Sequence, residues 1–531
     1  MMMARAGGRG SGGSDQQAAI KPSFTLPTSS LIGVGLVLLA LALRLYGLTG
    51  ESLWYDEAYS VWISDMDVGS LRVLWEWKVE FPLYYLLFHY WLRLFGQGEF
   101  AVRLFGALAG TATIIPVYLL GRELFDHKVG VFGALLLAVN PYHVWYSQEV
   151  RMHSWAVLLT VASLYCFWRL TNGGRWGCQT SFNPPQSKGG LRLVWWLGHI
   201  LITGLSFHLH YYIIWIVLVE NVYYLLHLWR KHGGILSREA WRSLRLWILD
   251  QLAVLLLAIP AAAVFLERFF ASNDWGWLVA NYRAPGLHDV LGLFEAYVLG
   301  MAFPGPSPLR WVILLGFLAL AGWGTLRGYE RIRRGAPSGG LELVLLTLAL
   351  PVTLVFVLGQ FVAVWVIRYL LLFLPAFLLL VALGVRALGR PALGAAAMIV
   401  LVAASLYALS GMYSKQQKED WRGVAAYISA HAAQDDLIVL MDEECRVPFS
   451  YYYGSKGARV EVSRFADGAA LNRAVAEIEH RQRGGSLWLV VSHAEGTGLE
   501  KRLEAVAGLR RAGSPAFVGV KLVHYEWFQG A

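Results

Sequence analysis

Two adjacent carboxylates, Asp56 and Glu57, stand among aromatic residues in the segment Trp54–Tyr59, just beyond the first apolar stretch. Acidic side chains at the edge of a membrane are costly to desolvate, so they are candidates for function. One of them could deprotonate an acceptor hydroxyl as a general base. Acids are also ordinary at the start of a solvated loop, and the residue types alone leave both interpretations open.

A third acid, Glu149, lies between two apolar stretches, with Arg151 and His153 close behind it. One interpretation is an ion pair within this loop that caps a helix. The functional interpretation makes Glu149 a second acid that faces Asp56, with Arg151 and His153 as its charge partners.

His208 and His210 flank one leucine and are followed by Tyr211. This i, i+2 spacing does not place both histidines on one helix face, so a two-histidine metal site is not expected. His210 or Tyr211 could instead hydrogen-bond a phosphate or a sugar. A satisfied histidine in an interfacial aromatic belt is the alternative.

Arg368, followed by Tyr369, and Arg103, preceded by Glu99, also lie near apolar stretches. The planar fork of a guanidinium group suits a phosphate at the membrane surface. Snorkelling of the arginine toward water is the alternative interpretation. Acids and cations together would suit transfer of a group from a phosphate-bearing lipid, with the arginines or a metal stabilising the departing phosphate.

The composition indicates that these residues work in a membrane. Of the 531 residues 56% are hydrophobic and 15% are charged, against roughly 25% charged residues in soluble domains. Several stretches approach the ~20 apolar residues that cross a bilayer. A soluble globular enzyme, a disordered chain and a coiled coil are thereby excluded. Three cysteines without a CxxC pair provide neither a disulfide framework nor a metal site.

We predict eleven membrane spans, near 31–48, 104–121, 129–146, 154–170, 193–208, 212–229, 247–266, 309–326, 341–363, 369–387 and 391–410. The apolar segment 82–95 has only 14 residues and contains His89 and Arg93, so it is predicted to lie at the interface. This choice places the basic loops near 122–128, 169–192, 230–245, 327–334 and 386–390 in the cytoplasm. The N-terminus is then cytoplasmic, and the candidate site residues lie outside.

Three regions are expected: a disordered cytoplasmic leader (1–29), a transmembrane domain (30–410) and an extracytoplasmic domain (411–531). The last contains 15 Lys or Arg and 15 Asp or Glu, so the net charge of +9 belongs to the rest of the chain. That excess indicates membrane topology and anionic lipid, and no basic stripe suggests nucleic acid.

The C-terminal domain alternates helical and strand patterns, which predicts a small α/β fold with a mostly parallel sheet. The predicted helices cover Trp421–His431, Leu471–Arg483 and Leu499–Leu509. The predicted strands cover Leu437–Met441, Arg459–Val462, Leu487–Val491 and Phe517–His524. Nucleotide and hydrolase motifs are missing, so an accessory or binding role is expected.

The sequence resembles the C-type superfamily of membrane glycosyltransferases, in particular the bacterial branch related to protein O-mannosyltransferases and to the aminoarabinose transferase of lipid A. The resemblance spans about 31–440. It rests, in chain order, on Trp54-Tyr55-Asp56-Glu57-Ala58, Phe81-Pro82-Leu83-Tyr84-Tyr85, Glu99 to Arg103, Asn140-Pro141-Tyr142, Tyr146-Ser147-Gln148-Glu149-Val150-Arg151-Met152, Arg368-Tyr369 with Pro375, and Asp420-Trp421-Arg422.

The resemblance implies an enzyme of a bacterial inner membrane that takes a sugar from a polyprenyl phosphate, usually with inversion. The acceptor would be a lipid, a glycan or a protein. Asp56 matches the acid of the family's first outer loop, the presumed base or substrate-orienting residue, with Glu57 beside it, and Glu149 matches the acid of the second. A strict Asp-x-Asp metal motif is missing around Glu149, which leaves a requirement for Mg or Mn open.

A transporter or flippase for a lipid-linked sugar is the main alternative function. It would predict inverted repeats or broken half-helices in matching halves of the chain. The sequence shows no convincing repeat, and its large first outer loop is asymmetric. A membrane anchor for a C-terminal binding module is a further alternative.

Overall fold

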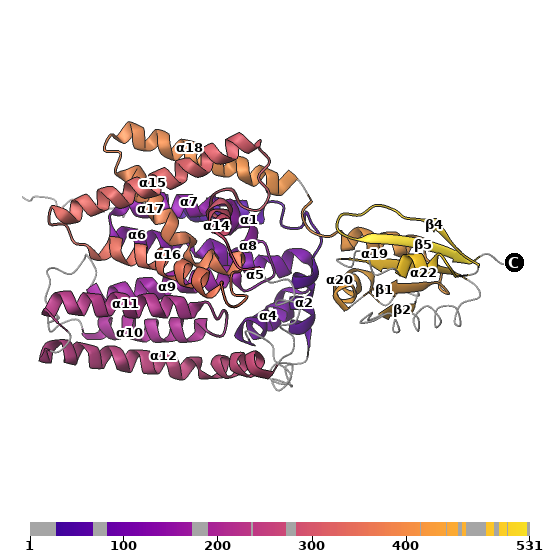
Figure 1. The fold of residues 1–531 in the computed structure, drawn as a ribbon, viewed down its shortest axis with the longest axis horizontal. Coiled ribbons are helices and arrows are strands. Elements are labelled where there is room, and N and C mark those ends of the chain that lie inside the picture. The colour runs from indigo at the N-terminus through magenta and orange to yellow at the C-terminus, as the bar shows by residue number, and fades with distance from the viewer. Residues whose placement is uncertain are drawn as a thin grey trace, which may run out of the picture.

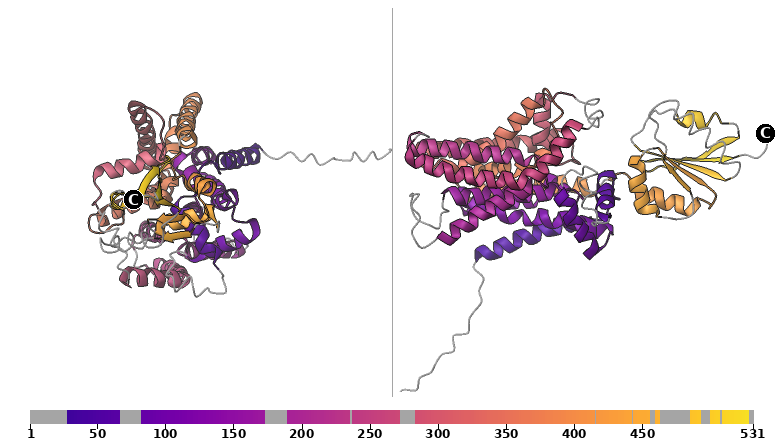
Figure 2. Two further views of the ribbon diagram at one scale, coloured as in Figure 1. Left: turned by 90° about the vertical axis from the view of Figure 1, so that its right-hand side faces the viewer. Right: turned by 90° about the horizontal axis from the view of Figure 1, so that it is seen from below.

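The computed structural model describes residues 28–66, 82–172, 189–234, 237–271, 283–414, 416–441, 443–454, 459–462, 485–492, 499–506 and 508–527. These residues form a helical bundle and a smaller α/β unit beyond one end of it (Figure 1). The view from below shows the same separation into two parts (Figure 2, right). Most of the predicted leader, the motif residue Phe81 and the predicted helix Leu471–Arg483 lie outside the described residues.

The bundle consists of helices that run in opposite directions through a common core. They are α1 (Thr28–Leu45), α2 (Tyr55–Asp65), α4 (Pro82–Phe95), α5 (Glu99–Ala112), α6 (Ile114–Leu124), α7 (His127–Ala138), α8 (Pro141–Ser147), α9 (His153–Asn172), α10 (Gly189–Ser206), α11 (Ile213–His232), α12 (Arg238–Ala271), α14 (Leu287–Leu299), α15 (Ser307–Arg333), α16 (Gly339–Leu358), η3 (Ile367–Phe373), α17 (Leu374–Arg386) and α18 (Pro391–Ser414).

The membrane-spanning pattern agrees with the sequence. Among the described residues eight helical segments are long and apolar enough to cross a membrane, and α7 with α8 makes a ninth if this bent pair is one span. Two shorter apolar helices cover Leu31–Leu45 and Leu193–Ser206. Each of the eleven predicted spans overlaps one of these segments. The predicted interfacial helix is α4, and α14 is a helix that the sequence analysis did not anticipate.

The centre of the bundle is η3 with α17, where nearly every side chain from Leu370 to Val385 is buried. Helix α15 packs directly against α17. A Cβ atom on Gly384 would collide with the carbonyl oxygen of Leu320, so only glycine permits this close approach of the two backbones. The core is therefore tightly packed around the span Ile367–Arg386.

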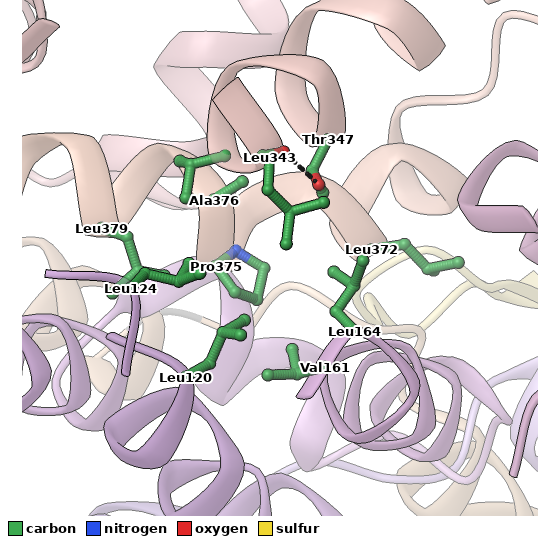
Figure 3. Close-up of a pocket in the computed structure, with 11 residues that line it drawn as sticks. Leu120, Leu124, Val161, Leu164, Leu343, Thr347, Leu372, Pro375, Ala376 and Leu379 are labelled. Atoms are coloured by element: carbon green, nitrogen blue, oxygen red, sulfur yellow. Dashed lines mark hydrogen bonds between the residues drawn. The ribbon is translucent and has the colours of Figure 1, made fainter. Parts of the chain in front are cut away.

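The interior of the bundle leaves little free space. A cavity of about 10 Å³ lies beside Pro375 of α17, with Leu120 of α6 and Val161 of α9 in its wall (Figure 3). The hydroxyl of Thr347 donates to the carbonyl oxygen of Leu343 in its own helix at 2.8 Å. Such an apolar cavity has room for about one water and no substrate, which places the chemistry elsewhere.

The C-terminal unit is an α/β fold with a five-stranded sheet in the order β2-β1-β3-β5-β4. Its elements are α19 (Trp421–His431), β1 (Leu437–Leu440), α20 (Glu443–Tyr453), β2 (Arg459–Val462), β3 (Ser486–Val491), α22 (Leu499–Leu503), β4 (Leu509–Gly513) and β5 (Lys521–Trp527).

The expected mostly parallel sheet is wrong, because the sheet is mixed. Strand β1 pairs parallel with β2 and β3, whereas β5 pairs antiparallel with β3 and β4. The alternation of helix and strand suggested crossovers throughout, but β4 and β5 form a hairpin at the end of the chain. The predicted helix at Leu499–Leu509 ends at Leu503, and β4 begins at Leu509.

Candidate active site

The site lies at the end of the bundle that faces the α/β unit, and Asp56 in the first turn of α2 belongs to it. The side chain of Asp56 is one-fifth exposed, and its Oδ2 accepts a hydrogen bond from Nη1 of Arg368 at 3.1 Å. Arg368 lies in η3, more than 300 residues away in sequence. The fold thus joins an acid and a cation that the sequence analysis proposed separately.

Glu57, the neighbour of Asp56, is fully buried. Arg103 of α5 donates to both of its carboxylate oxygens, at 3.0 and 2.7 Å, and Nζ of Lys418 lies 3.0 Å from Oε2. Burial alone would raise the pKa of Glu57, but these two cations outweigh burial and hold the pKa at about 2. The contacts favour a role for Glu57 in holding the site together.

The guanidinium group of Arg103 uses its donors within the protein. Besides Glu57 it donates to the carbonyl oxygens of Leu48, Glu51 and Ser52 in the segment before α2. Because its donors are used, the geometry favours a structural role for Arg103 over the phosphate binding that the sequence suggested.

Glu149 is buried just beyond the end of α8, and its Oε1 accepts from Nε1 of Trp145 at 3.0 Å. Burial raises the pKa of Glu149 to about 7. Lys418 opposes this rise, whereas Glu57 and Asp56 add to it. Glu149 is therefore poised to change its charge near neutral pH.

A break in the span presents Glu149 to the site. Asn140 caps α8 by accepting from the backbone N–H of His143, Pro141 occupies the first turn, and α8 bends by 59° from α7. The buried Arg44 of α1 donates to the carbonyl oxygens of Leu137 and Ala138 at the break, at 3.3 and 3.1 Å. Arg44 was not anticipated from the sequence.

Two guanidinium groups lie close to Asp56. Besides Arg368 there is Arg151, which attracts Asp56 electrostatically and donates weakly to the hydroxyl of Tyr85 at 3.5 Å. Within the described residues, the Nε atoms of Arg151 and Arg368 are buried without a hydrogen-bond partner. Two like charges with unused donors around one carboxylate suit an anion.

A cluster of rings extends from Arg368, whose guanidinium carbon lies 5.6 Å from the ring centre of Tyr369. Tyr369 contacts His210 edge to face at 4.8 Å, and His153 and Tyr211 lie within 6 Å of it. Burial lowers the pKa of His210 to about 3, with both nearby arginines contributing. The neutral ring accepts at Nδ1 from the backbone N–H of Tyr212, so Nε2 carries the proton.

A polar cavity of about 170 Å³ lies beside Arg103 and Lys418, the two cations that contact Glu57. The segment after α1, the end of α8 and the end of α18 contribute to its wall. Trp145, Gln148 and Tyr413 are also among its lining residues. Trp145 thus lines this cavity and donates to Glu149 as well.

The fold brings the predicted residues Asp56, Glu149, Arg151, Arg368 and Tyr369 into one region, with His153, His210 and Tyr211 beside them. His208 is directed away, since its Nε2 contacts the carbonyl oxygen of Leu257 at 2.8 Å. The sequence analysis missed Lys418. Its position two residues before the Asp420-Trp421-Arg422 motif was the available signal.

The acids of the site are engaged by cations and by an indole. Asp56 accepts from Arg368, and Glu149 accepts from the ring N–H of Trp145. Among the described residues no group of three or more His, Cys, Asp or Glu could hold a metal ion. These contacts do not fit a resident Mg or Mn ion.

The family model of dolichyl-phosphate-mannose-protein mannosyltransferases matches residues 80–179. That match includes α4, Arg103, Glu149 and Arg151. No curated protein sequence matches the chain.

Solved structures match over nearly the whole chain. ArnT from Cupriavidus metallidurans in the apo state is 14% identical, with a TM-score of 0.60, over 94% of this chain and 98% of that one. The same protein bound to undecaprenyl phosphate is 13% identical, with a TM-score of 0.57 over the same shares. The oligosaccharyltransferase of Archaeoglobus fulgidus is 14% identical, with a TM-score of 0.52, over 87% of this chain and 69% of that one.

The fold is that of the C-type membrane glycosyltransferases, and the resemblance seen in the sequence is confirmed. The matched family and these structural neighbours are glycosyltransferases. A further structure of the archaeal enzyme contains zinc and sulfate.

Proposed function

We propose that this chain is a glycosyltransferase that moves a sugar from a polyprenyl phosphate to an acceptor hydroxyl on a lipid, glycan or protein. The observation that carries the proposal is the contact of Asp56 with Arg368 beside Arg151, two arginines with unused Nε donors. A base and an anion site thus lie side by side at the end of a membrane bundle.

The arginines define the donor side of the proposed site. Their planar forks suit the phosphate that links a sugar to its lipid carrier. ArnT of Cupriavidus metallidurans has been solved with undecaprenyl phosphate, and the archaeal oligosaccharyltransferase with a dolichol-phosphate. Both compounds are polyprenyl phosphates, which supports this class of donor here.

In the proposed reaction Asp56 takes the proton of the acceptor hydroxyl as its oxygen attacks the anomeric carbon. The bond from that carbon to the phosphate oxygen breaks, and the electron pair leaves with the polyprenyl phosphate. Arg368 and Arg151 stabilise this charge. Attack opposite the leaving phosphate inverts the anomeric carbon.

Glu149 is assigned an electrostatic role in the same reaction. The transition state of glycosyl transfer resembles an oxocarbenium ion, which a nearby carboxylate stabilises. Because the pKa of Glu149 is raised to about 7, its charged form increases as the pH rises through neutrality. His153, His210, Tyr211 and Tyr369 are proposed to bind the sugar or the phosphate.

We place the site on the outer face of a bacterial plasma membrane. The basic loops support this orientation, with a cytoplasmic N-terminus and an extracytoplasmic C-terminal domain at residues 411–531. The transmembrane domain is proposed to cover 30–410, preceded by a cytoplasmic leader at 1–29.

The test is transfer from radiolabelled polyprenyl-phosphate sugars by purified protein in lipid, with a panel of donors, a membrane extract as acceptor, and chelator as a further condition. Asp56→Asn should lower transfer at least about 100-fold, because the base is lost. Asp65→Asn, at the far end of the same helix, should leave transfer unchanged.

Equal transfer by wild type and Asp56→Asn would rule out Asp56 as the base. Failure of the wild type with every donor, together with movement of the lipid between leaflets, would favour the transporter instead.

A further inference from the structure

We propose that Lys418 is a positioning residue of the transfer site, through which the chain entering the C-terminal unit holds Glu57 directly and acts on the buried Glu149 across Trp145. The role rests on the proposed transfer reaction, in which Glu149 acts as a carboxylate. Lys418 lies in the short segment between α18 and α19 and takes no part in bond making.

The geometry places Lys418 against Glu57 and over the ring of Trp145, the indole that binds Glu149. Nζ of Lys418 lies 3.0 Å from Oε2 of Glu57 and 5.7 Å from the ring centre of Trp145. The indole N–H of Trp145 in turn donates to Glu149 at 3.0 Å. The side chain of Lys418 is only 9% exposed, so little solvent screens its charge from either carboxylate.

The backbone around Lys418 is held in place. The N–H groups of Gln417 and Lys418 donate to the carboxylate of Glu51, and the hydroxyl of Ser52 donates to the carbonyl oxygen of Glu419. These contacts join the segment to the residues just before α2. The ammonium group is thereby fixed relative to Asp56 and Glu57.

Lys418 is the strongest attractive charge that acts on Glu149. The other groups that interact with Glu149 are the acids Asp56 and Glu57 of α2, the cation Arg368 of η3, and the phenols Tyr84 of α4 and Tyr142 and Tyr146 of α8. Burial and the two acids favour the neutral form of Glu149. Among the described residues, Arg368 and the indole N–H of Trp145 would still favour the charged form without Lys418.

The experiment follows the pH dependence of the apparent unfolding temperature of the full-length protein, which requires no turnover. The pKa of folded Glu149 is raised above its usual 4.5, so its contribution to stability is greatest below pH 4.5 and falls until about pH 7. In Lys418→Met the pKa of folded Glu149 should rise, so the unfolding temperature should keep falling to a pH about one unit higher or more.

Two further variants distinguish this effect on Glu149 from a general loss of stability. Lys418→Arg keeps the positive charge and should restore the wild-type pH dependence. In Glu149→Gln the unfolding temperature should no longer fall between pH 4.5 and 7. The double variant Glu149→Gln/Lys418→Met should likewise show no fall in this range. Lys418 also lowers the pKa of Glu57, which is about 2. That acid therefore titrates below pH 4.5, outside the range that reports on Glu149.

A second measurement is the pH profile of transfer. Its acidic midpoint should shift upward in Lys418→Met and return in Lys418→Arg, whereas loss of packing alone would lower transfer equally at every pH. Lys521→Met, a surface lysine paired with Glu500, is the matched control.

An unchanged pH dependence of both unfolding and transfer in Lys418→Met would overturn the role of Lys418. A protein that transfers no sugar but shows the shifted unfolding profile would refute the proposed function while leaving the coupling of Lys418 to Glu149 intact.

Discussion

Asp56 and Glu57 are neighbours in sequence with opposite environments. Asp56 is partly exposed and contacts the single arginine Arg368. Glu57 is fully buried between Arg103 and Lys418, and its Oε1 also accepts from the backbone N–H of Val150 at 3.2 Å. The first turn of α2 points one acid toward Arg368 and the other into the buried pair of cations.

Glu57→Gln should therefore act on stability. It keeps the shape of the side chain but leaves Arg103 and Lys418 buried without their carboxylate, at a cost of about 3–5 kcal/mol. Thermal unfolding in detergent with added lipid measures this loss.

The pH dependence of unfolding shows whether the lost stability comes from the charge of Glu57. The pKa of folded Glu57 is lowered to about 2, so its contribution is fully present above pH 4.5 and is lost as the pH falls toward 2. Glu57→Gln should lack this acid-side loss. A variant as stable as wild type at pH 7 would contradict the scaffold role.

Among the helices, α9, α10, α11 and α12 share a buried polar group that was not predicted from the sequence. Nε2 of His199 in α10 lies 3.1 Å from Oε2 of Glu220 in α11. Its Nδ1 lies 2.9 Å from Oδ2 of Asp250 in α12. Ser163 of α9 donates to Glu220 at 2.8 Å. Polar side chains that satisfy one another between helices hold them together where lipid offers no partner.

His199→Ala should destabilise this part of the bundle. The change leaves Glu220 and Asp250 buried without their shared donor, at a cost of about 3–5 kcal/mol, visible as a lower apparent unfolding temperature. His227→Ala, at a half-buried position of α11, is the control. Equal shifts of the unfolding temperature in the two variants would disprove a special role for the polar group. Adding Glu220→Gln to His199→Ala should recover part of the lost stability, because it removes one of the two unpaired carboxylates.

For the molecule as a whole, the α/β unit docks through α20 on α2, on the segment before it and on Glu99 of α5. The hydroxyl of Tyr452 accepts from the backbone N–H of Leu53 at 2.6 Å and donates to Glu99 at 2.5 Å. Arg422 of α19 lies 3.3 Å from the same carboxylate. The docking residues thus contact the segment that leads into Asp56.

Tyr452→Phe should loosen this docking without unfolding either part. Two hydrogen bonds, each worth about 0.5–1.5 kcal/mol, are lost, so the amides of residues 52–57 should exchange with solvent about tenfold faster. Hydrogen exchange with mass spectrometry measures this rate. Tyr329→Phe, an exposed position on α15, should change nothing, and unchanged exchange in Tyr452→Phe would argue against docking through this hydroxyl.

Features that depend on local composition were predictable. Apolar length predicted helices that overlap all eleven spans and the separate helix α4, and periodicity predicted α19 with its bounds as well as β1, β2 and β3. The hairpin of β4 and β5 was not predictable, because strand direction depends on which neighbour the strand meets. Helix α20 was missed as well.

The many apolar segments, the class of fold and the set of candidate polar residues could be read from the sequence alone, because the bilayer imposes length and polarity on each segment separately. Only the tertiary structure decided what each polar residue does. It paired Arg103 with Glu57, placed Arg368 beside Asp56 and brought Lys418 from the C-terminal segment to Glu57. Charge state and hydrogen bonding depend on burial and on partners hundreds of residues away, which no local pattern contains.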